Sequence, residues 1–303
     1  MGFVDRYFFN PTFLQKIVIF ILLPISFLYA LISFLNNRFR KKIDFDLPII
    51  SVGNLSVGGN GKTPTCIAIS KLFEDKKVFI ILRGYKRSTK GALIVKLDNE
   101  IKCSVQESGD EAYEYALFSK ANVIVSEKRE VGIDIAKQNN AQIIILDDAF
   151  SKVHIKKFDI LLFSKVMPKY NFCLPSGAYR LPVFCKKYAD FLAYEGDDFE
   201  RLSEFEPKDD MVLISSIAKP FRLDGFKKYA KAFYFLNDHD EISYEFCEQK
   251  LKQNNAKTIL CTKKDYVKIK DYGFDICLID LKIKLSDNFK QAILEYVKNY
   301  KKE

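Results

Sequence analysis

The sequence predicts an α/β fold: a mostly parallel sheet core, a second, smaller α/β domain after it, and an N-terminal membrane helix before it. Three observations predict this arrangement. Short apolar segments alternate with amphipathic helical segments along most of the chain, as in βαβ units. A glycine-rich loop joins one apolar segment to a helical one at residues 53–63, and a long uncharged segment precedes it at residues 17–35.

Composition limits the classes of protein that the chain can be. It has 303 residues, of which 48% are hydrophobic and 29% charged, which excludes disordered and collagen-like chains. The net charge of +9 favours anionic partners such as phosphates or acidic lipids. None of the seven cysteines forms a C-x-x-C pair, so reduced thiols are expected rather than a zinc site or disulfides.

The first element is an apolar helix at the N-terminus. Ile17–Leu35 carries no charge, and at ~1.5 Å per residue this segment spans about 28 Å, close to the ~30 Å hydrocarbon core of a bilayer. Pro24 predicts a kink in its middle. The basic run Arg38–Lys42 follows, and the positive-inside rule places the rest of the chain in the cytoplasm.

Two membrane arrangements stay open for this segment. A more polar face, formed by Ser26, Tyr29 and Ser33, allows the helix to lie in the membrane interface instead of spanning the bilayer. A buried core helix and a cleaved signal peptide are the competing interpretations. We expect residues 1–42 to form a membrane anchor with a basic flank.

The second element is a phosphate-binding loop. Leu47–Val52 predicts a buried strand and Lys62 begins a helix, with the glycine-rich segment between them. In such a loop, backbone N–H groups and the helix N-terminus bind phosphate oxygens, the lysine (Lys62) reaches the β- and γ-phosphates, and the hydroxyl of Thr63 binds Mg²⁺. The strict G-x-x-x-x-G-K-[ST] pattern has Ser56 in place of its first glycine. The expected nucleotide contacts are Ser56, Val57, Gly58, Gly59, Asn60, Gly61, Lys62 and Thr63.

This order of elements predicts a P-loop NTPase-like core that binds ATP and Mg²⁺. Such a core also needs a carboxylate at the end of a neighbouring strand. Ile143–Leu146 predicts a central strand, and Asp147 and Asp148 follow at its carboxyl end, where ligands bind in open α/β sheets. An acidic turn or helix-capping pair is the alternative. Asp147, Asp148 and Thr63 are therefore the candidate metal ligands.

The remaining strands divide between the two domains. A polar stretch at residues 195–210 marks the expected boundary, which gives domains of residues 43–204 and 205–303 after the N-terminal segment 1–42. Further strands of the first domain are expected at Val78–Leu82, Val123–Val125 and Asp159–Phe163. Those of the second are expected at Met211–Ser215, Ala232–Leu236, Thr258–Cys261 and Asp275–Ile279.

A series of motifs resembles the tetraacyldisaccharide 4′-kinases, the lipid A 4′-kinases of Gram-negative bacteria. The motifs extend from residue 52 to about residue 268 and include the Ser56 departure, and the membrane helix before them also matches. They are Val52–Pro64 (VGNLSVGGNGKTP), Arg83–Arg87 (RGYKR), Ser108–Ala112 (SGDEA), Asp147–Phe150 (DDAF), Pro175–Gly177 (PSG), Asn237–His239 (NDH) and Thr262–Asp265 (TKKD).

The resemblance implies a reaction and a place. The family transfers the γ-phosphate of ATP to the 4′-hydroxyl of an acylated glucosamine disaccharide 1-phosphate, in lipopolysaccharide biosynthesis. It does so at the inner face of the cytoplasmic (inner) membrane. An acylated disaccharide substrate, ATP, Mg²⁺ and membrane lipids are then the expected partners, with the catalytic domains on the cytoplasmic side.

The resemblance also assigns roles to single residues. Asp110 would be the base that acts on the sugar hydroxyl, His239 would be its partner, and Lys62 would be the phosphate-loop lysine. Glu111 would lie close to the metal or nucleotide, and Arg180 near the nucleotide. Arg83, Arg87 and Arg129 resemble family arginines with looser roles. Taken alone, Asp110 is typical of a helix start and His239 of a surface loop.

Three positions depart from the family pattern. Gly-Phe-Gln-His becomes Ala149–Lys152, an acid is replaced by Leu181, and another by Lys263. These changes affect nucleotide contacts rather than the reaction class. Because Asp110 falls in the first domain and His239 in the second, we expect the site to lie in a cleft whose closure brings the pair together.

Two other functions remain as alternatives. A membrane-anchored P-loop ATPase acting as a regulatory switch would release phosphate instead of labelling a lipid. A GTPase is disfavoured because the chain has no N-K-x-D motif for guanine. A nucleic-acid partner is not expected, because no basic and aromatic pattern suited to one is present.

Overall fold

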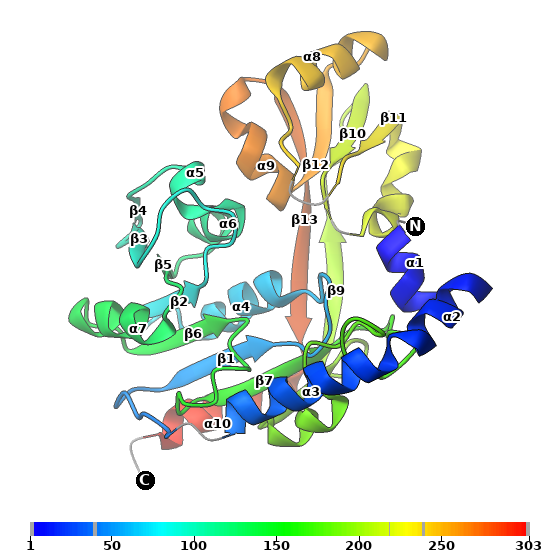
Figure 1. The fold of residues 1–303 in the computed structure, drawn as a ribbon. Coiled ribbons are helices and arrows are strands. Elements are labelled where there is room, and N and C mark those ends of the chain that lie inside the picture. The colour runs from blue at the N-terminus through cyan, green and yellow to red at the C-terminus, as the bar shows by residue number, and fades with distance from the viewer. Residues whose placement is uncertain (1–2, 39–40, 218, 238–239, 301–303) are drawn as a thin grey trace.

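Two sheets connected by a pair of antiparallel strands organise the chain (Figure 1). The computed structural model describes residues 3–38, 41–217, 219–237 and 240–300. The eight-stranded sheet with its helices forms the first lobe, and the upper part of the five-stranded sheet with its helices forms the second lobe. The expected mixed α/β fold with a parallel-dominated sheet is confirmed.

The large sheet has the order β4-β3-β5-β2-β6-β1-β7-β8. Along the sheet, β5, β2, β6, β1, β7 and β8 all run parallel. At the edge, β3 is antiparallel to both of its neighbours, β4 and β5. In chain order the strands are β1 (Ile49–Gly53), β2 (Val78–Leu82), β3 (Leu93–Leu97), β4 (Glu100–Ile101), β5 (Asn122–Val125), β6 (Ile143–Asp147), β7 (Phe158–Phe163) and β8 (Phe191–Tyr194).

Alternating side chains of the parallel strands fill two cores. Ile50, Ile80 and Ile145 face one side of the sheet, and Ile49, Ile81 and Ile144 face the other, as the period of two in a strand requires. Helices α4 (Lys62–Ser70), α6 (Asp110–Phe118) and α10 (Asp287–Asn299) cover the first side, and α7 (Arg129–Gln138) covers the second. The short helix α5 (Val105–Ser108) leads into α6.

The five-stranded sheet has the order β11-β10-β12-β13-β9. Its strands are β9 (Phe199–Glu204), β10 (Met211–Ser215), β11 (Ala230–Phe235), β12 (Thr258–Thr262) and β13 (Asp275–Leu285). The second lobe also contains the 3₁₀ segment η3 (Pro220–Tyr229), α8 (Tyr244–Gln253) and α9 (Lys263–Ile269). The first half of β13 pairs with β12, and its second half pairs antiparallel with β9, so these two strands connect the lobes.

The C-terminal helix returns to the first lobe. Phe289 and Ile293 on α10 are fully buried in the same core as Ile50, together with Leu285 at the end of β13. The Tyr296 hydroxyl bonds the backbone of Ile49, accepting from its N–H and donating to its carbonyl. The division at residue 204 stays a prediction, but residues 283–300 contribute to the core that it assigns to residues 43–204.

Three helices form the N-terminus: α1 (Phe3–Phe9), α2 (Phe13–Ile21) and α3 (Leu23–Arg38). The single helix expected over Ile17–Leu35 is therefore two, with a 54° bend between α2 and α3 at the position where Pro24 predicts a kink. Among the described residues, no helix is by itself long and apolar enough to cross a membrane, although α2 and α3 together meet that test as a bent pair.

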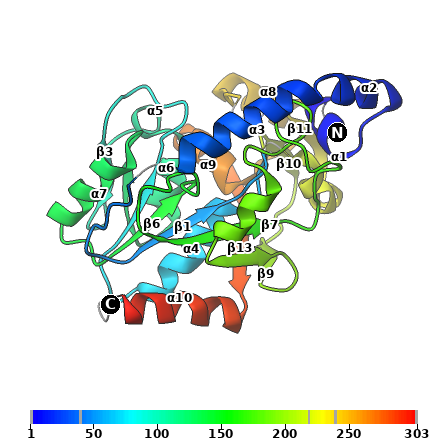
Figure 2. The ribbon, with the colours of Figure 1, turned by 60° about the horizontal axis from the view of Figure 1, so that its bottom comes forward.

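Helix α3 lies along the first lobe, opposite α10 (Figure 2). Its polar side faces the protein: the buried Ser26 hydroxyl accepts a hydrogen bond from Ser176 N (2.9 Å), and Tyr29 and Phe34 pack against the core that contains Leu161. Its other side is apolar and exposed. The large hydrophobic residues exposed by more than half on α2 and α3 are Phe13, Leu14, Phe20, Ile21, Ile25, Phe27, Leu28 and Leu31.

A buried carboxylate holds the second lobe together. Asp265 is fully buried and accepts hydrogen bonds from Ser215 Oγ (2.7 Å), Ser216 N (2.8 Å), Ser216 Oγ (2.9 Å) and Thr262 Oγ (2.7 Å). We expect Asp265→Asn to lower the free energy of unfolding by about 3 kcal/mol, because the amide NH₂ faces donors where the carboxylate accepted. Urea unfolding measures this effect.

The exposed Asp271 offers a matched control. Its side chain is 79% exposed and, among the described residues, pairs with Lys270, so Asp271→Asn should change the unfolding free energy by less than about 0.5 kcal/mol. Equal urea midpoints for the two variants would contradict the role given to Asp265.

Candidate functional site

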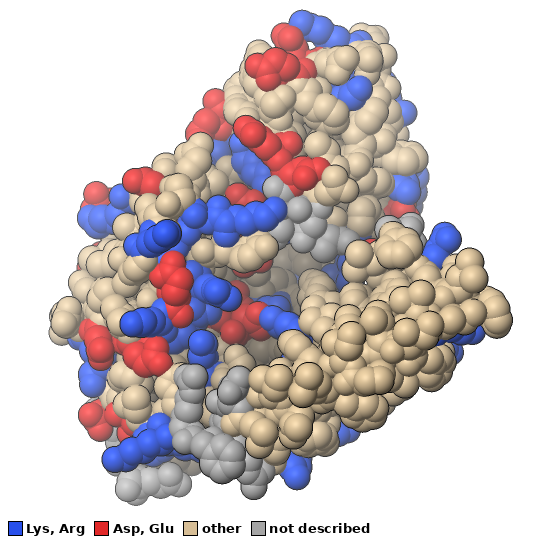
Figure 3. Space-filling view, viewed as in Figure 1, with Lys and Arg blue, Asp and Glu red and all other residues tan. Residues whose placement is uncertain are grey.

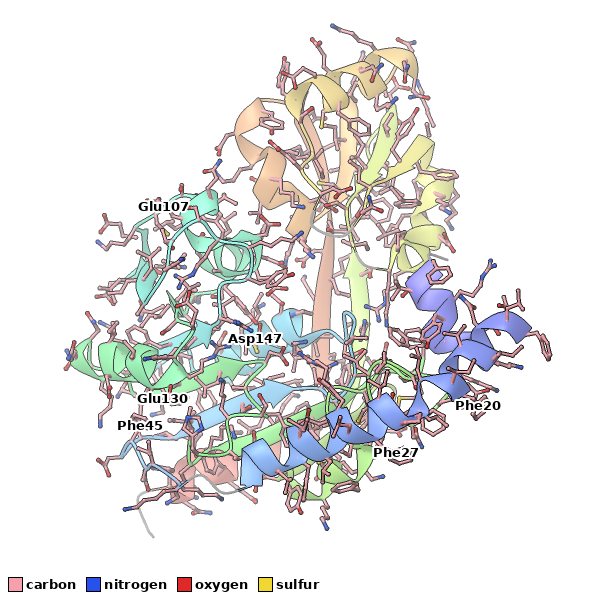
Figure 4. All side chains as sticks on the ribbon, in the orientation of Figure 1. Phe20, Phe27, Phe45, Glu107, Glu130 and Asp147 are labelled. Atoms are coloured by element: carbon pink, nitrogen blue, oxygen red, sulfur yellow. The ribbon has the colours of Figure 1, made fainter. Side chains whose placement is uncertain are left out.

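The candidate site lies at the carboxyl edge of the large sheet, where β1 and β6 end side by side. Val52 at the end of β1 pairs with Asp147 at the end of β6, and Asp148 N donates to Val52 O (2.9 Å). This juxtaposition brings the glycine loop after β1 against the acidic pair after β6, as the sequence predicts. Figure 4 places Asp147 in the middle of the molecule, below the second lobe.

The glycine loop turns from β1 into α4, which begins at Lys62 as predicted. Gly58 (φ 104°) and Gly61 (φ 85°) adopt left-handed backbone that other residues rarely adopt, and Gly61 is the N-cap residue of α4. Asn60 fixes the loop from inside: its amide donates to Ser56 Oγ (3.1 Å) and accepts from Ser164 Oγ (3.3 Å). The N–H of Val57 is used within the chain, on Ala178 O (2.7 Å).

Asn54 connects the basic side chains of the site. The Oδ1 atom of this buried amide accepts from Lys62 Nζ (3.0 Å) and from Arg180 Nη2 (2.9 Å). Sequence reasoning missed Asn54. The available signal was an amide directly after a wholly buried strand, where a buried polar side chain must find partners.

Asp147 is the most desolvated acid of the site. It is 4% exposed, and its Oδ2 atom accepts from the Tyr115 hydroxyl (3.0 Å). Burial raises the pKa of Asp147 to about 7; Lys62 opposes the rise, whereas Glu111 and Asp148 add to it. Its Oδ1 atom is buried and has no hydrogen-bond partner among the described residues.

Asp148 is held in the ionised form by two cations. Arg180 binds both its oxygens (2.8 and 3.0 Å), and Lys62 Nζ lies 3.9 Å away. Burial alone would raise the pKa of this carboxyl, but Lys62 and Arg180 outweigh it and the pKa is lowered. Asp148 has a positive φ of 52°, so the backbone leaves the extended conformation of β6 at this residue. Arg129, buried beneath the pair, donates to Asp147 O (3.1 Å).

The acidic pair and the glycine loop fit a magnesium ion bound together with a nucleotide. Among the residues that the structure describes, no group of three or more His, Cys, Asp or Glu side chains could hold a metal unaided. The unpartnered Asp147 Oδ1 is an oxygen ligand of the kind that Mg²⁺ prefers, and Mg²⁺ commonly takes its remaining ligands from phosphates and water. Thr63, in the first turn of α4, offers a hydroxyl.

Asp110 lies at the N-terminus of α6, against the second lobe. It follows Gly109 (φ 84°), where a Cβ atom would lie 2.9 Å from Tyr85 O, so the SGDEA and RGYKR segments pack together. Lys268 Nζ on α9 lies 3.5 Å from Asp110 Oδ2 and donates to Ser216 Oγ (2.9 Å) and Asp240 O (2.8 Å).

His239 lies outside the described residues, but its neighbour Asp240 is held by Lys268. Asp110 of the first lobe and residue 240 of the second therefore share one ammonium group, which sequence reasoning also missed. Glu111 follows Asp110 and acts electrostatically on Asp147. Arg87 pairs with Glu127 (2.6 Å) and packs near Gly109, whereas Arg83 is exposed and acts electrostatically on Arg129.

Between the lobes the surface is hollowed, with basic and acidic side chains on its walls, and an almost uncharged surface over α2 and α3 borders it (Figure 3). A hollow with charged side chains on its walls and an apolar margin suits an anionic substrate that has a hydrophobic part.

Known proteins match the chain over most of its length. The model of the tetraacyldisaccharide-1-P 4′-kinase family matches residues 18–222. A tetraacyldisaccharide 4′-kinase of Campylobacter jejuni serotype O:2 is 54% identical over 298 residues, which cover 98% of this chain and 96% of the relative. One of Helicobacter pylori strain 26695 is 40% identical over 302 residues, with the same coverage.

A solved structure is similar in fold. The crystal structure of LpxK from Aquifex aeolicus in complex with ATP has a TM-score of 0.78 and 29% sequence identity. The match covers 92% of this chain and 99% of that one.

Proposed function

The chain belongs to the tetraacyldisaccharide 4′-kinase family, and we propose that, as an ATP-dependent lipid A 4′-kinase, it performs phosphoryl transfer at the edge formed by β1 and β6. The acceptor is the 4′-hydroxyl of an acylated glucosamine disaccharide 1-phosphate. The single observation that carries the proposal is the meeting of the Lys62 loop with the Asp147–Asp148 pair at the carboxyl edge of the large sheet.

The residues have separable tasks in this transfer. Lys62 and the N–H groups of the glycine loop bind the β- and γ-phosphates and neutralise their charge. Asp147, Asp148 and Thr63 would hold Mg²⁺, which supplies charge neutralisation on the phosphate oxygens when bound. Arg180 and Asn54 keep Asp148 and Lys62 in place. Asp110 accepts the proton of the sugar hydroxyl, with His239 as its partner.

Transfer of labelled γ-phosphate tests the function. Detergent-solubilised protein with ATP and Mg²⁺ should label tetraacyldisaccharide 1-phosphate, and Lys62→Ala should abolish the label. Phosphate release that depends on Lys62 without lipid labelling would contradict the kinase and favour the membrane-anchored ATPase. Loss of labelling on chelation of divalent ions would support Mg²⁺ as the cofactor.

We also propose that the exposed apolar sides of α2 and α3 bind the cytoplasmic membrane, where the lipid substrate resides. The support is the arrangement of α3, whose polar side is bonded to Ser176 while Phe27 (69% exposed) and Leu28 (60% exposed) face outward. Such a helix lies in the interface plane and buries its apolar side among lipids.

The double variant Phe27→Ser/Leu28→Ser should lower partitioning onto vesicles of phosphatidylethanolamine and phosphatidylglycerol by at least about tenfold, because a fully buried large apolar side chain contributes about 1.5–3 kcal/mol. Co-sedimentation measures the partition coefficient. Leu294→Ser on α10, on the opposite face, removes an exposed leucine and serves as control. Equal partitioning of the double variant and the control would contradict membrane binding through α3.

A further inference from the structure

Three basic side chains reach the glycine loop from the side of the second lobe. Arg201 lies on β9, Lys219 immediately precedes η3, and Arg222 lies within η3. Arg222 Nη1 donates to Gly59 O (2.6 Å). A Cβ atom on Gly58 would lie 3.3 Å from Lys219 Nζ, and one on Gly61 would lie 3.2 Å from Arg201 Nη2. The glycines of the loop thus permit close approach of three cations.

Lys219 and the Arg201 side chain are buried, Arg222 is half-buried, and the cluster has fewer acidic partners than cations. Lys219 is 4% exposed, and the side chain of Arg201 is 11% exposed. Among the described residues, Glu195 is in contact, with its Oε1 atom 3.1 Å from Arg201 Nε, and Asp5 on α1 acts electrostatically on Lys219 and Arg222. Arg201 Nη2 is buried and has no hydrogen-bond partner, and Lys219 Nζ has no ion pair or hydrogen bond within the described part of the chain. Burying more cations than there are carboxylates to balance them is costly, so the cluster is suited to an anion.

Burial lowers the pKa of both Lys219 and Arg222, and repulsion between the cations of the cluster lowers it further. Burial and the charge of Arg222 lower the pKa of Lys219 to about 8. Burial and the charge of Arg201 lower the pKa of Arg222 to about 10. The Lys219 ammonium rests 4.6 Å from the centre of the Phe9 ring on α1, which partly compensates for its missing partner.

We propose that Arg201, Lys219 and Arg222 form an anion subsite on the second-lobe side of the glycine loop, where they bind phosphate oxygens. The nucleotide is the favoured source, because the cluster contacts the same glycines that bind a polyphosphate chain; the phosphate of the lipid substrate has the same chemistry. This proposal takes one point from the proposed function, namely that the glycine loop binds a phosphate ligand.

A purely structural role predicts a different pattern. One hydrogen bond from Arg222 to Gly59 O would fasten the loop, and Lys219 would have no part in it. An anion subsite requires Lys219 as well, because the residue contributes its positive charge to the site. An anion subsite also predicts that the ligand-free protein becomes more stable when one of the cations is removed.

Lys219→Met tests this difference, since methionine retains the apolar stem and its place against Phe9. In the full, detergent-solubilised chain without ligand, the melting temperature should rise. The further rise caused by magnesium pyrophosphate should fall to less than half of the wild-type value, and the Kd for ATP should increase about tenfold. Arg222→Gln should weaken ATP binding in the same way, whereas Lys228→Met, an exposed lysine of η3, should change neither quantity.

The outcomes are distinct. An unchanged pyrophosphate-induced shift in Lys219→Met, together with an unchanged KM for the lipid, would overturn the subsite. Unchanged ATP and pyrophosphate binding with a raised KM for the lipid would support the subsite and assign its anion to the lipid phosphate. Absence of lipid labelling by the wild-type protein would contradict the proposed kinase but leave the pyrophosphate result intact.

Discussion

Replacing Asp110 by asparagine is expected to lower kcat for lipid phosphorylation by about 10²–10⁴-fold while leaving the KM for ATP nearly unchanged. The amide retains the size of the side chain but cannot accept the proton of the sugar hydroxyl, and general-base catalysis contributes about this factor. The position suits the task, because Asp110 opens α6 beside the hollow between the lobes and lies 3.5 Å from Lys268 Nζ. Initial rates of labelled phosphate transfer at saturating ATP measure the effect.

Two further variants make this prediction specific. Asp134→Asn changes an exposed acid on α7 and should leave kcat unaltered. His239→Ala should lower kcat, and combining it with Asp110→Asn should add little, because two residues that act as one unit are not additive. Wild-type rates for both single variants would reject the assigned pair.

Lys62→Met is expected to lower kcat/KM by at least about 10²–10³-fold, the loss seen when one preorganised charge-stabilising donor is removed. The loss has a second source. Lys62 holds down the pKa of both Asp147 and Asp148, so its removal favours their protonated forms and weakens any metal bound there. Activity titrated with Mg²⁺ should therefore also show a higher metal requirement.

Lys71→Met is the matched control for Lys62→Met. Lys71 is an exposed lysine at the end of the same helix and carries the same charge away from the loop. It should leave kcat/KM and the Mg²⁺ requirement unchanged. A Lys62→Met enzyme within about threefold of wild type would show that the loop does not bind the transferred phosphate in the way proposed.

Patterns within short stretches of sequence predicted the buried strands, the start of α4 and the position of the acidic pair. The strands at Val78–Leu82 and Met211–Ser215 have the expected bounds, because fully buried parallel strands are continuous apolar runs. The start of α4 at Lys62 follows from the glycine loop before it. The acidic pair met this loop because carboxyl ends of adjacent parallel strands share an edge.

Contacts between distant segments could not be predicted in the same way. The pairing of Lys268 with Asp110 joins helices of different lobes, and neither residue carries a local signal for it. The polar stretch at residues 195–210, which is the predicted domain boundary, contains β9, and no local pattern indicates that the second half of β13 is its partner. The roles of Asp110 and His239 came from family resemblance, since taken alone Asp110 is typical of a helix start and His239 of a surface loop.

The return of α10 to the first lobe determines when the protein can finish folding during synthesis. The core that begins at Ile50 is completed by Phe289 and Ile293, so about 240 residues must be translated between its first and last members. At about 5–20 residues per second this interval lasts on the order of 10–50 s. The apolar helices α2 and α3 are synthesised before this interval begins, so the membrane contact proposed above can precede completion of the catalytic core.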